Sequence, residues 1–329
     1  LFSENNLFNV NNIELEKKGN ISNNMLTEQA IKRGFNQLKT KILLKEDSKK
    51  LSDLKFSTIK RLVKYYQINR ISDEKKKGQQ LNFSVTFDKN KIHDLFLLRG
   101  ISYSEISDKE LYILPILIKD NEVSIFNNNF FYENWNKVYE NDLIEFVLLL
   151  ENIETIKKIN DHKNDLIKLN LTNLFEEFLD KNLALIIIEI SKTSEIKVYI
   201  KSIIQGKSIS KNLDLNNQKI ITNNLNKKII SEVKMELINL VKSKNLIDVG
   251  TPLFLNAKLN INKKSNLVKL NSRIKKIDSI ENIYVQEFNK DYINLRIKYF
   301  GKLDKILIQL KKENIDLQLT NDEWVIKTL

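Results

Sequence analysis

The 329-residue chain contains no cysteine, only two prolines and only seven glycines. The absence of cysteine excludes disulfide bonds and thiolate metal sites. No two glycines are close enough to form a glycine-rich phosphate-binding loop. The two histidines, His93 and His162, are too few for most histidine-based zinc sites. No apolar run approaches the roughly 18 residues that a membrane-spanning helix needs.

The composition is that of a folded protein with a basic excess. Hydrophobic residues make up 42% and charged residues 29% of the chain, whose length suits two or three domains. The net charge is +12, but most basic residues are lysines, whereas nucleic-acid sites favour arginine. The densest run, Lys75 to Lys77, precedes Gly78 in an expected hairpin turn. It is either a solvated turn or a contact for an anionic partner.

Periodicity predicts an N-terminal α/β domain over residues 1–130. Residues 7–16 alternate as a strand, and apolar residues recur at helical spacing over 25–44 and again from Ser57 to Tyr66. Residues 81–87 alternate strictly, as the second strand of a hairpin does. Asp88 can cap a helix that Gly100 ends. The apolar run 111–118 contains Pro115, which favours an edge or irregular strand.

Two further units are expected after this domain. Residues 131–248 form a middle α/β domain, with strands at 143–150, 183–190 and 196–204 and helices at 171–179 and 217–242. Residues 249–329 follow the order β-α-β-β-α-β-β, the split βαβ or ferredoxin-like plan. Each helix of this last unit has one apolar stripe, so both should cover the same sheet face. The fold class is therefore α/β (α+β), built from three small mixed-sheet units.

Neither histidine is part of a recognisable catalytic group. His93 lies on a predicted helix and His162 in a polar loop. A catalytic histidine needs a nucleophile or an orienting partner, and no serine lies in a nucleophile-elbow pattern. We therefore expect no catalytic, cofactor-binding or metal-binding residues, and a protein that is not an enzyme.

Two pairs of carboxylates are candidate sites. Glu176 and Glu177 are neighbours on a predicted helix, so they point about 100° apart and suit a solvated face better than hydrolysis. Asp120 and Glu122 flank a short turn, which supplies too few oxygens for a calcium loop.

An aromatic group follows the asparagine run 127–129. Its members are Phe130, Phe131, Tyr132 and Trp135. At a domain junction such a group either fills the interdomain seam or forms a partner surface. Trp324 alternates with Ile326, which is typical of a core residue. Four aromatic residues of the last domain could form an RNA-stacking sheet; they are Tyr284, Phe288, Tyr292 and Tyr299. The characteristic run of glycines and basic residues of that module is absent, which argues against this interpretation.

Three stretches together resemble the domain-of-unknown-function 2066 family of exported Gram-negative bacterial proteins. They are "EQAIKRGFNQLKTKIL" at 28–43, the segment from "LNFSVTFDKNKIHDLFLLRGISYSE" through "LPILI" to "ENWNKVY", and "IENIYVQEFNKDYINLRIKYFGKLDKILIQLKKENIDLQLTNDEWVI". The chain departs from the family at Tyr139 and at Leu267 or Val268, where members often carry tryptophan. The middle unit also resembles the TolB N-terminal type of α/β domain.

The resemblance implies an exported, periplasmic protein with no established activity. The sequence starts at Leu1, and we expect a secretory signal, either a signal peptide or a lipoprotein signal, to have preceded it. A non-catalytic accessory protein that docks on an envelope protein or a peptidoglycan component is the expected function. The alternative is a nucleic-acid-binding protein that acts through the +12 charge.

Overall fold

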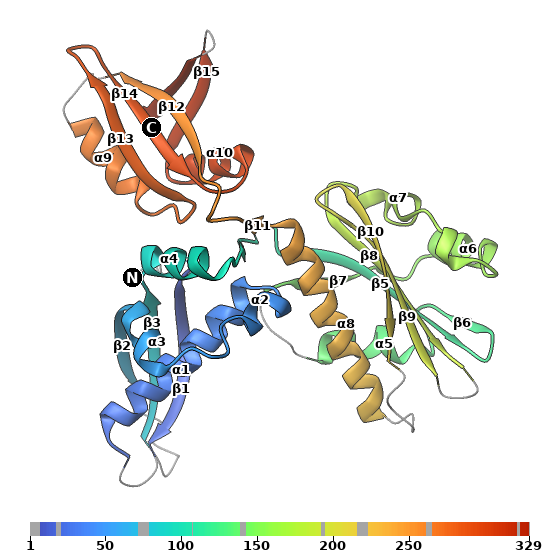
Figure 1. Cartoon of the computed structure of the whole chain (residues 1–329). Helices are drawn as coiled ribbons and strands as arrows, with labels where there is room; N and C mark the ends of the chain where they lie inside the picture. The colour runs from blue at the N-terminus through green and yellow to red at the C-terminus, as the bar shows by residue number, and fades with distance from the viewer. Residues whose placement is uncertain are drawn as a thin grey trace. The chain divides into compact units, whose positions relative to one another are not determined.

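The chain has a mixed α/β fold, as predicted (Figure 1). The computed structural model describes residues 7–17, 21–71, 79–106, 108–138, 143–191, 195–215, 223–260, 265–320 and 323–328. The lysine run at 75–77 and the predicted turns at 193–194 and 321–322 lie outside these ranges. The chain divides into two units, of which unit 1 comprises Leu1–Glu105 and Leu246–Leu329, and unit 2 comprises Ile106–Asn245.

The N-terminal part of unit 1 is a three-stranded sheet in the order β1-β3-β2, with helix α1 on one face. Alternate residues of β3, from Leu81 to Phe87, are buried because they face α1. Gly34 allows the helix to approach closely, since an added Cβ would lie 3.0 Å from the Ile13 side chain and 3.4 Å from that of Val85. The elements are β1 (Asn9–Lys17), α1 (Asn23–Ile42), α2 (Lys45–Lys49), α3 (Phe56–Leu62), β2 (Val63–Ile71), β3 (Gln79–Phe87), α4 (Lys89–Arg99) and β4 (Tyr103–Ser104).

The C-terminal part of unit 1 returns to this N-terminal part through a short pairing. Strand β11 (Leu246–Ile247) is antiparallel to β4, with Ile247 opposite Tyr103. Ile247, Val249 and Phe300 then join the same buried cluster as Phe8 and Tyr103. Unit 2 is therefore an insertion between two strands that pair with each other.

The rest of unit 1 is a five-stranded sheet in the order β13-β14-β12-β16-β15. Both helices contribute to one buried cluster with alternate strand residues such as Leu295 and Ile297, so they cover the same face, as predicted. Strand β16 lies between β12 and β15 and runs parallel to β12. The elements are β12 (Leu253–Asn260), α9 (Ser265–Ile274), β13 (Ile280–Phe288), β14 (Tyr292–Tyr299), α10 (Leu303–Lys312), β15 (Ile315–Thr320) and β16 (Glu323–Thr328).

Unit 2 is built on a six-stranded sheet with a buried cluster on each face. The order is β10-β9-β8-β5-β6, and β7 also pairs with β5. Helix α8 belongs to the cluster on one face, whereas α6 and α7 contribute to the other. The elements are β5 (Glu110–Lys119), β6 (Glu122–Ser124), α5 (Phe130–Asn134), η1 (Trp135–Lys137), β7 (Glu145–Leu148), α6 (Ile153–Asp161), η2 (Leu166–Lys168), α7 (Leu171–Leu174), η3 (Glu176–Phe178), β8 (Asn182–Ile190), β9 (Ile196–Ile204), β10 (Lys207–Asp214) and α8 (Asn223–Lys244).

Strand β5 is internal, which corrects the edge strand expected around Pro115. It pairs with β8 along one side, from Leu111 to Lys119. On its other side β7 pairs up to Ile113 and β6 pairs from Leu117 onward. Pro115 lies in the interval between these two partners, where its missing N–H costs no ladder hydrogen bond.

The buried Asn129 side chain forms hydrogen bonds with backbone groups around this interval. Its Nδ2 donates to the carbonyl oxygens of Pro115 at 2.9 Å, Ser124 at 3.1 Å and Ile125 at 2.7 Å. Its Oδ1 accepts from the first N–H groups of α5, those of Phe131 and Tyr132. One amide therefore caps a helix and closes the gap beside β5.

The apolar pattern predicts a domain boundary near residue 130, whereas the structure divides the chain after Glu105. A boundary at 130 would separate β5 from β8, which pair residue by residue in one sheet. The predicted boundary after residue 248 places Ile247 in the middle domain and Phe300 in a separate C-terminal domain, whereas both share a core with the N-terminal part. The local pattern of apolar residues does not show these long-range contacts.

Several elements differ from their predicted bounds. The helix expected from Ser57 to Tyr66 ends at Leu62, where β2 begins. The helix expected over 171–179 is one short α-helix followed by a 3₁₀ turn. Strand β10 and helix α6 were not predicted; β10 is largely exposed, so its sequence has little apolar alternation.

We expect Asn129→Ala to lower the free energy of unfolding by about 3 kcal/mol or more, because buried carbonyl and N–H groups lose their partners. Asn127→Ala is the matched control, since that side chain is exposed and should change stability by less than about 1 kcal/mol. Urea denaturation of both variants measures the difference. Equal effects would contradict the role assigned to Asn129.

We also expect residues 106–245 to fold when expressed alone, because their sheet and both clusters are complete within the segment. Residues 1–105 alone should not fold, since Ile247, Val249 and Phe300 are missing from their core. Circular dichroism and cooperative thermal unfolding test both fragments. A cooperative transition in fragment 1–105 would show that the returning residues are dispensable.

Candidate functional site

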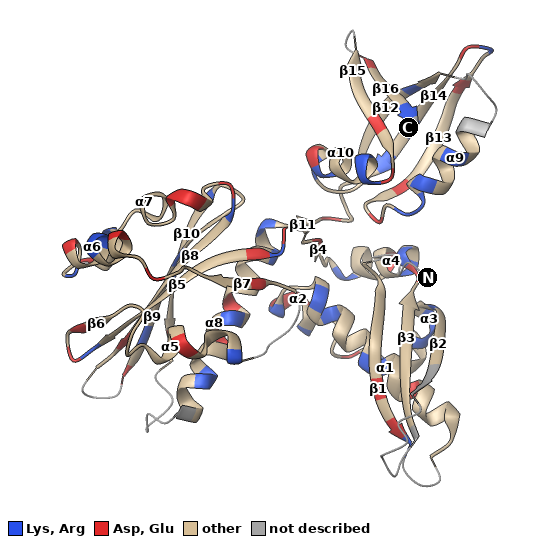
Figure 2. Ribbon diagram, turned by 180° about the vertical axis from the view of Figure 1, so that it is seen from behind, with Lys and Arg blue, Asp and Glu red and all other residues tan. Residues whose placement is uncertain are grey.

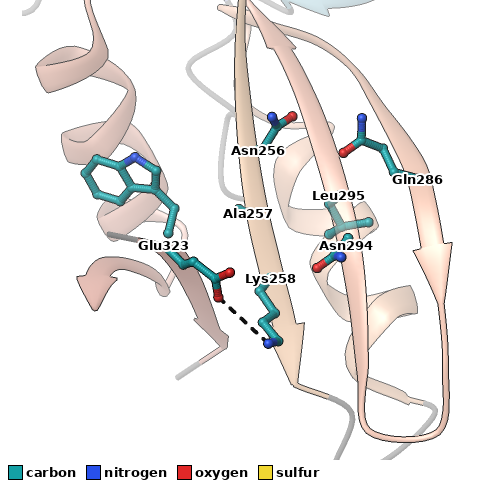
Figure 3. Close-up of a pocket in the computed structure, with 8 residues that line it drawn as sticks. Asn256, Ala257, Lys258, Gln286, Asn294, Leu295 and Glu323 are labelled. Carbon is teal, nitrogen blue, oxygen red and sulfur yellow. Dashed lines mark ion pairs between the residues drawn. The ribbon is translucent and has the colours of Figure 1, made fainter. Parts of the chain in front are cut away.

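The best candidate site is an open groove of about 400 Å³ in the C-terminal sheet of unit 1. Its polar residues come from four strands, so no single sequence segment contains them (Figure 3). Asn256 and Lys258 lie on β12, at alternate positions to the buried Leu255, Ala257 and Leu259. The groove is lined by Asn256, Ala257, Lys258, Gln286, Asn294, Leu295, Glu323 and Trp324.

Charged side chains at the groove are held by specific partners. Lys258 Nζ lies 3.8 Å from Glu323 Oε2, and the two side chains point toward one another (Figure 3). The same Nζ is 4.1 Å from the centre of the Tyr292 ring. Nearby on this sheet, the Arg296 guanidinium lies 4.1 Å from the ring centre of Phe254. Such cation–π contacts reduce the freedom of long basic side chains and so prepare them for binding.

Amide side chains give the groove its hydrogen-bonding capacity. Asn294 Nδ2 donates to Glu287 Oε2 at 2.9 Å, which orients that amide. Among the described residues, Asn256 and Gln286 have no side-chain hydrogen-bond partner, and both are exposed. Each amide offers donors and an acceptor, so the groove matches ligands that carry both kinds of group. The lining residues include no histidine, serine or cysteine.

A second group of polar residues lies where the two parts of unit 1 meet, with Ser279 buried and Glu105 and Gln309 half-buried. Gln309 Nε2 donates to Glu105 Oε1 at 2.7 Å, and the Ser279 hydroxyl lies 3.3 Å from Glu105 Oε2. Burial and the nearby Asp278 carboxylate raise the pKa of Glu105, while Lys305 and the two hydrogen bonds act in the opposite direction. These hydrogen bonds satisfy the Glu105 carboxyl group within the structure.

His93 lies in an aromatic part of the same core and is only 7% exposed. Its ring stacks on Tyr103 at 5.3 Å between centres and meets the rings of Phe8 and Phe300 edge-on at 5.6 and 5.3 Å. Among the described residues, neither ring nitrogen has a hydrogen-bond partner. Burial, with a smaller contribution from Lys89, lowers the pKa of His93 to about 4. The imidazole is therefore neutral at pH 7 and packs as an aromatic core residue.

The remaining candidate residues do not gather into a site: His162 and Glu176 have structural partners, and Asp120 lies in a turn. His162 ends α6, with Nδ1 3.0 Å from the Lys158 carbonyl oxygen. Glu176 forms an ion pair with Lys158 at 3.0 Å. Asp120 has a positive φ of 53° in the tight turn between β5 and β6. Among the described residues, no three acidic or histidine side chains form a group that could hold a metal ion.

The aromatic group after residue 129 lies in the core of unit 2. Phe131 and Trp135 are completely buried, so they do not form the partner surface considered above. The Trp135 ring centre lies 6.0 Å from that of Phe146. Phe130 and Tyr132 are half-buried, and the Tyr132 hydroxyl donates to the Leu149 carbonyl oxygen at 3.0 Å. The aromatic residues anchor α5 and η1 within the sheet unit.

Comparisons with known proteins identify no family. No family model matches the chain, and no curated protein matches it. One solved structure, described as a crystal structure of an uncharacterized protein, is similar over 43% of this chain and 94% of that chain, with 9% identity and a TM-score of 0.18. In the described part of the chain, no helix combines the length and hydropathy needed to cross a membrane.

We expect the stability of the protein to fall between pH 6.5 and pH 4, partly because His93 stays neutral in the core while the unfolded chain binds a proton. The lowered pKa corresponds to about 3 kcal/mol, present above pH 6.5 and lost by pH 4. Urea denaturation of His93→Phe across this range should show a flatter pH dependence, because the replacement keeps an aromatic ring without a titrating group.

His162→Gln is the matched control, since His162 is exposed and is the other histidine of the chain. It should retain the full pH dependence of the unchanged protein. Glu105 has the opposite sign, because its raised pKa favours the folded state as the pH falls. It is present in all three proteins, so the difference between them reports His93. Identical pH profiles for His93→Phe and the unchanged protein would contradict this assignment.

Proposed function

We propose that the protein is a non-catalytic binding protein of the bacterial periplasm that holds a peptidoglycan component in the groove of its C-terminal sheet. The compartment rests on the resemblance of three sequence stretches to an exported family. The binding role rests on the groove itself. Its lining is made of amides, one ion pair and the sides of apolar residues, which suit recognition of a polar ligand.

The observation that carries the proposal is the pair of exposed amides, Asn256 and Gln286, beside the Lys258–Glu323 ion pair. Sugar hydroxyl and acetamido groups carry donors and acceptors together, as side-chain amides do. Lys258 provides a positive charge for the carboxylates of peptide stems. The groove volume of about 400 Å³ lies within the range of ligand sites in proteins, roughly 300–1,000 Å³.

Nucleic-acid binding is the alternative, because the net charge is +12. Figure 2 shows basic and acidic residues interspersed along the elements of both units. At the groove, Lys258 is paired with Glu323 and Asn294 with Glu287, so carboxylates accompany the basic side chain. A phosphate-binding surface favours an uninterrupted run of basic groups. The groove therefore supports a ligand of hydroxyl, amide and single carboxylate groups better than a nucleic acid.

We expect the purified protein to co-sediment with isolated peptidoglycan, and the double variant Asn256→Ala, Gln286→Ala to bind about thirtyfold more weakly. Two lost hydrogen bonds at about 1 kcal/mol each account for a change of this size. The control is Asn11→Ala, Asn212→Ala, which removes two exposed amides from β1 and β10 and should bind normally.

Binding is measured from the fraction sedimented at increasing salt. The same protein is also titrated with single-stranded DNA. If log affinity for the DNA falls with log salt by a slope of several units, and the protein does not bind peptidoglycan, the nucleic-acid alternative replaces the proposal. Equal binding by both double variants would show that peptidoglycan is held elsewhere on the protein.

A further inference from the structure

Strand β2 forms one outer strand of the N-terminal sheet, because the order is β1-β3-β2. Within the described residues it pairs with β3 alone, over a register that runs from Val63 to Ile71. The N–H and C=O groups of alternate residues therefore point away from β3, toward the open side. A strand edge of this length is a template for a further strand.

The two edges of this sheet differ in how well they are protected. On β1 the pairing with β3 shifts between Val10 and Ile13, and Asn12 has a positive φ of 59°. This edge also carries the exposed carboxylates of Glu14 and Glu16. Bulges and charges of this kind hinder the addition of a strand. On β2 the only shift is at its start, between Val63 and Tyr65, and the register is regular from there onward.

An uncovered apolar strip lies beside the β2 edge. Tyr66 is opposite Val85 and Ile68 is opposite Phe83, and both β3 residues are completely buried beneath α1. Tyr66 and Ile68 thus lie on the same sheet face as the core, yet they are 46% and 42% exposed. Helix α1 packs closely over β1 and β3 at Gly34 and leaves this strip open. A strand added to β2 would place every second side chain against the strip.

The charge of β2 indicates what kind of strand fits. Its sequence, VKYYQINRI, contains two basic residues and no acidic one, and the exposed Lys60 and Arg61 precede it on α3. A second copy of this chain, paired antiparallel about Gln67, would bring Lys64 opposite Arg70. Like charges at opposite positions destabilise strand pairing, so self-association is disfavoured. A strand that carries carboxylates is favoured instead.

We propose that β2 is a docking edge for an extended, acidic segment of a partner protein, which adds a fourth strand to the β1-β3-β2 sheet. Apolar side chains at alternate positions of that segment contact Tyr66 and Ile68, and its carboxylates lie near Lys64 and the basic residues of α3. This edge and the groove of the C-terminal sheet consist of different residues, so either assignment stands without the other.

The probe is a fluorescein-labelled nine-residue peptide in which valine and glutamate alternate, titrated with the full chain and followed by fluorescence anisotropy. The peptide with lysine in place of glutamate should bind at least about tenfold more weakly. Two N-methylated forms of the acidic peptide separate strand addition from simple charge attraction. Methylation of one alternate set of amides should abolish binding, and methylation of the other set should preserve it, because only one set faces β2.

Two protein variants locate the site. Lys64→Glu should weaken binding of the acidic peptide about fivefold or more, whereas Lys207→Glu, at an exposed position of the outer strand β10, should leave it unchanged. Circular dichroism confirms that both variants are folded. Equal binding of the two methylated peptides, an equal effect of both substitutions, or a dimer of the unliganded protein that Lys64→Glu dissociates would each overturn the proposal.

Discussion

The return of the chain from unit 2 to the N-terminal sheet is the constraint on which the rest of unit 1 depends. Strands β4 and β11 pair over two residues, and Ile247, Val249 and Phe300 then complete the core around Phe8 and Tyr103. The same closure brings the Glu105 carboxyl beside Ser279 and Gln309. A buried carboxyl group without such partners would be costly, so the hydrogen bonds and the apolar contacts support one another.

The sequence predicted those parts of the fold that depend on local periodicity. Strict alternation located β3, helical spacing located α1 and α8, and the strand and helix order of residues 249–329 was correct. Contacts between segments that are distant in the sequence produce no local periodicity of apolar residues, so they could not be predicted. The β5–β8 ladder joins residues about seventy positions apart. Pro115 is tolerated in β5 because, on the other side of this strand, the pairing with β7 ends at Ile113 and the pairing with β6 begins only at Leu117. Neither fact can be read from the apolar run alone.

The candidate site was predicted least well, for a related reason. Asn256, Gln286 and Glu323 are ordinary exposed residues in the sequence, and they come together only when β12, β13 and β16 enter one sheet. The aromatic run at 130–135 predicted an interdomain seam or a partner surface, because four large rings lie within six consecutive residues. In the structure its tryptophan fills a core, whereas polar amides line the groove. Alternation did predict which strand residues face inward, and therefore which faces remain open.

The insertion of unit 2 between β4 and β11 has a consequence for synthesis of the protein. A ribosome completes residues 106–245 before it adds Ile247, Val249 and Phe300, so unit 2 has its whole core available first. During that interval Phe8, Phe96 and Tyr103 lack the residues that later cover them. The N-terminal sheet thus reaches its final packing only after unit 2 is complete, and in the meantime it presents apolar surface of the kind that chaperones bind.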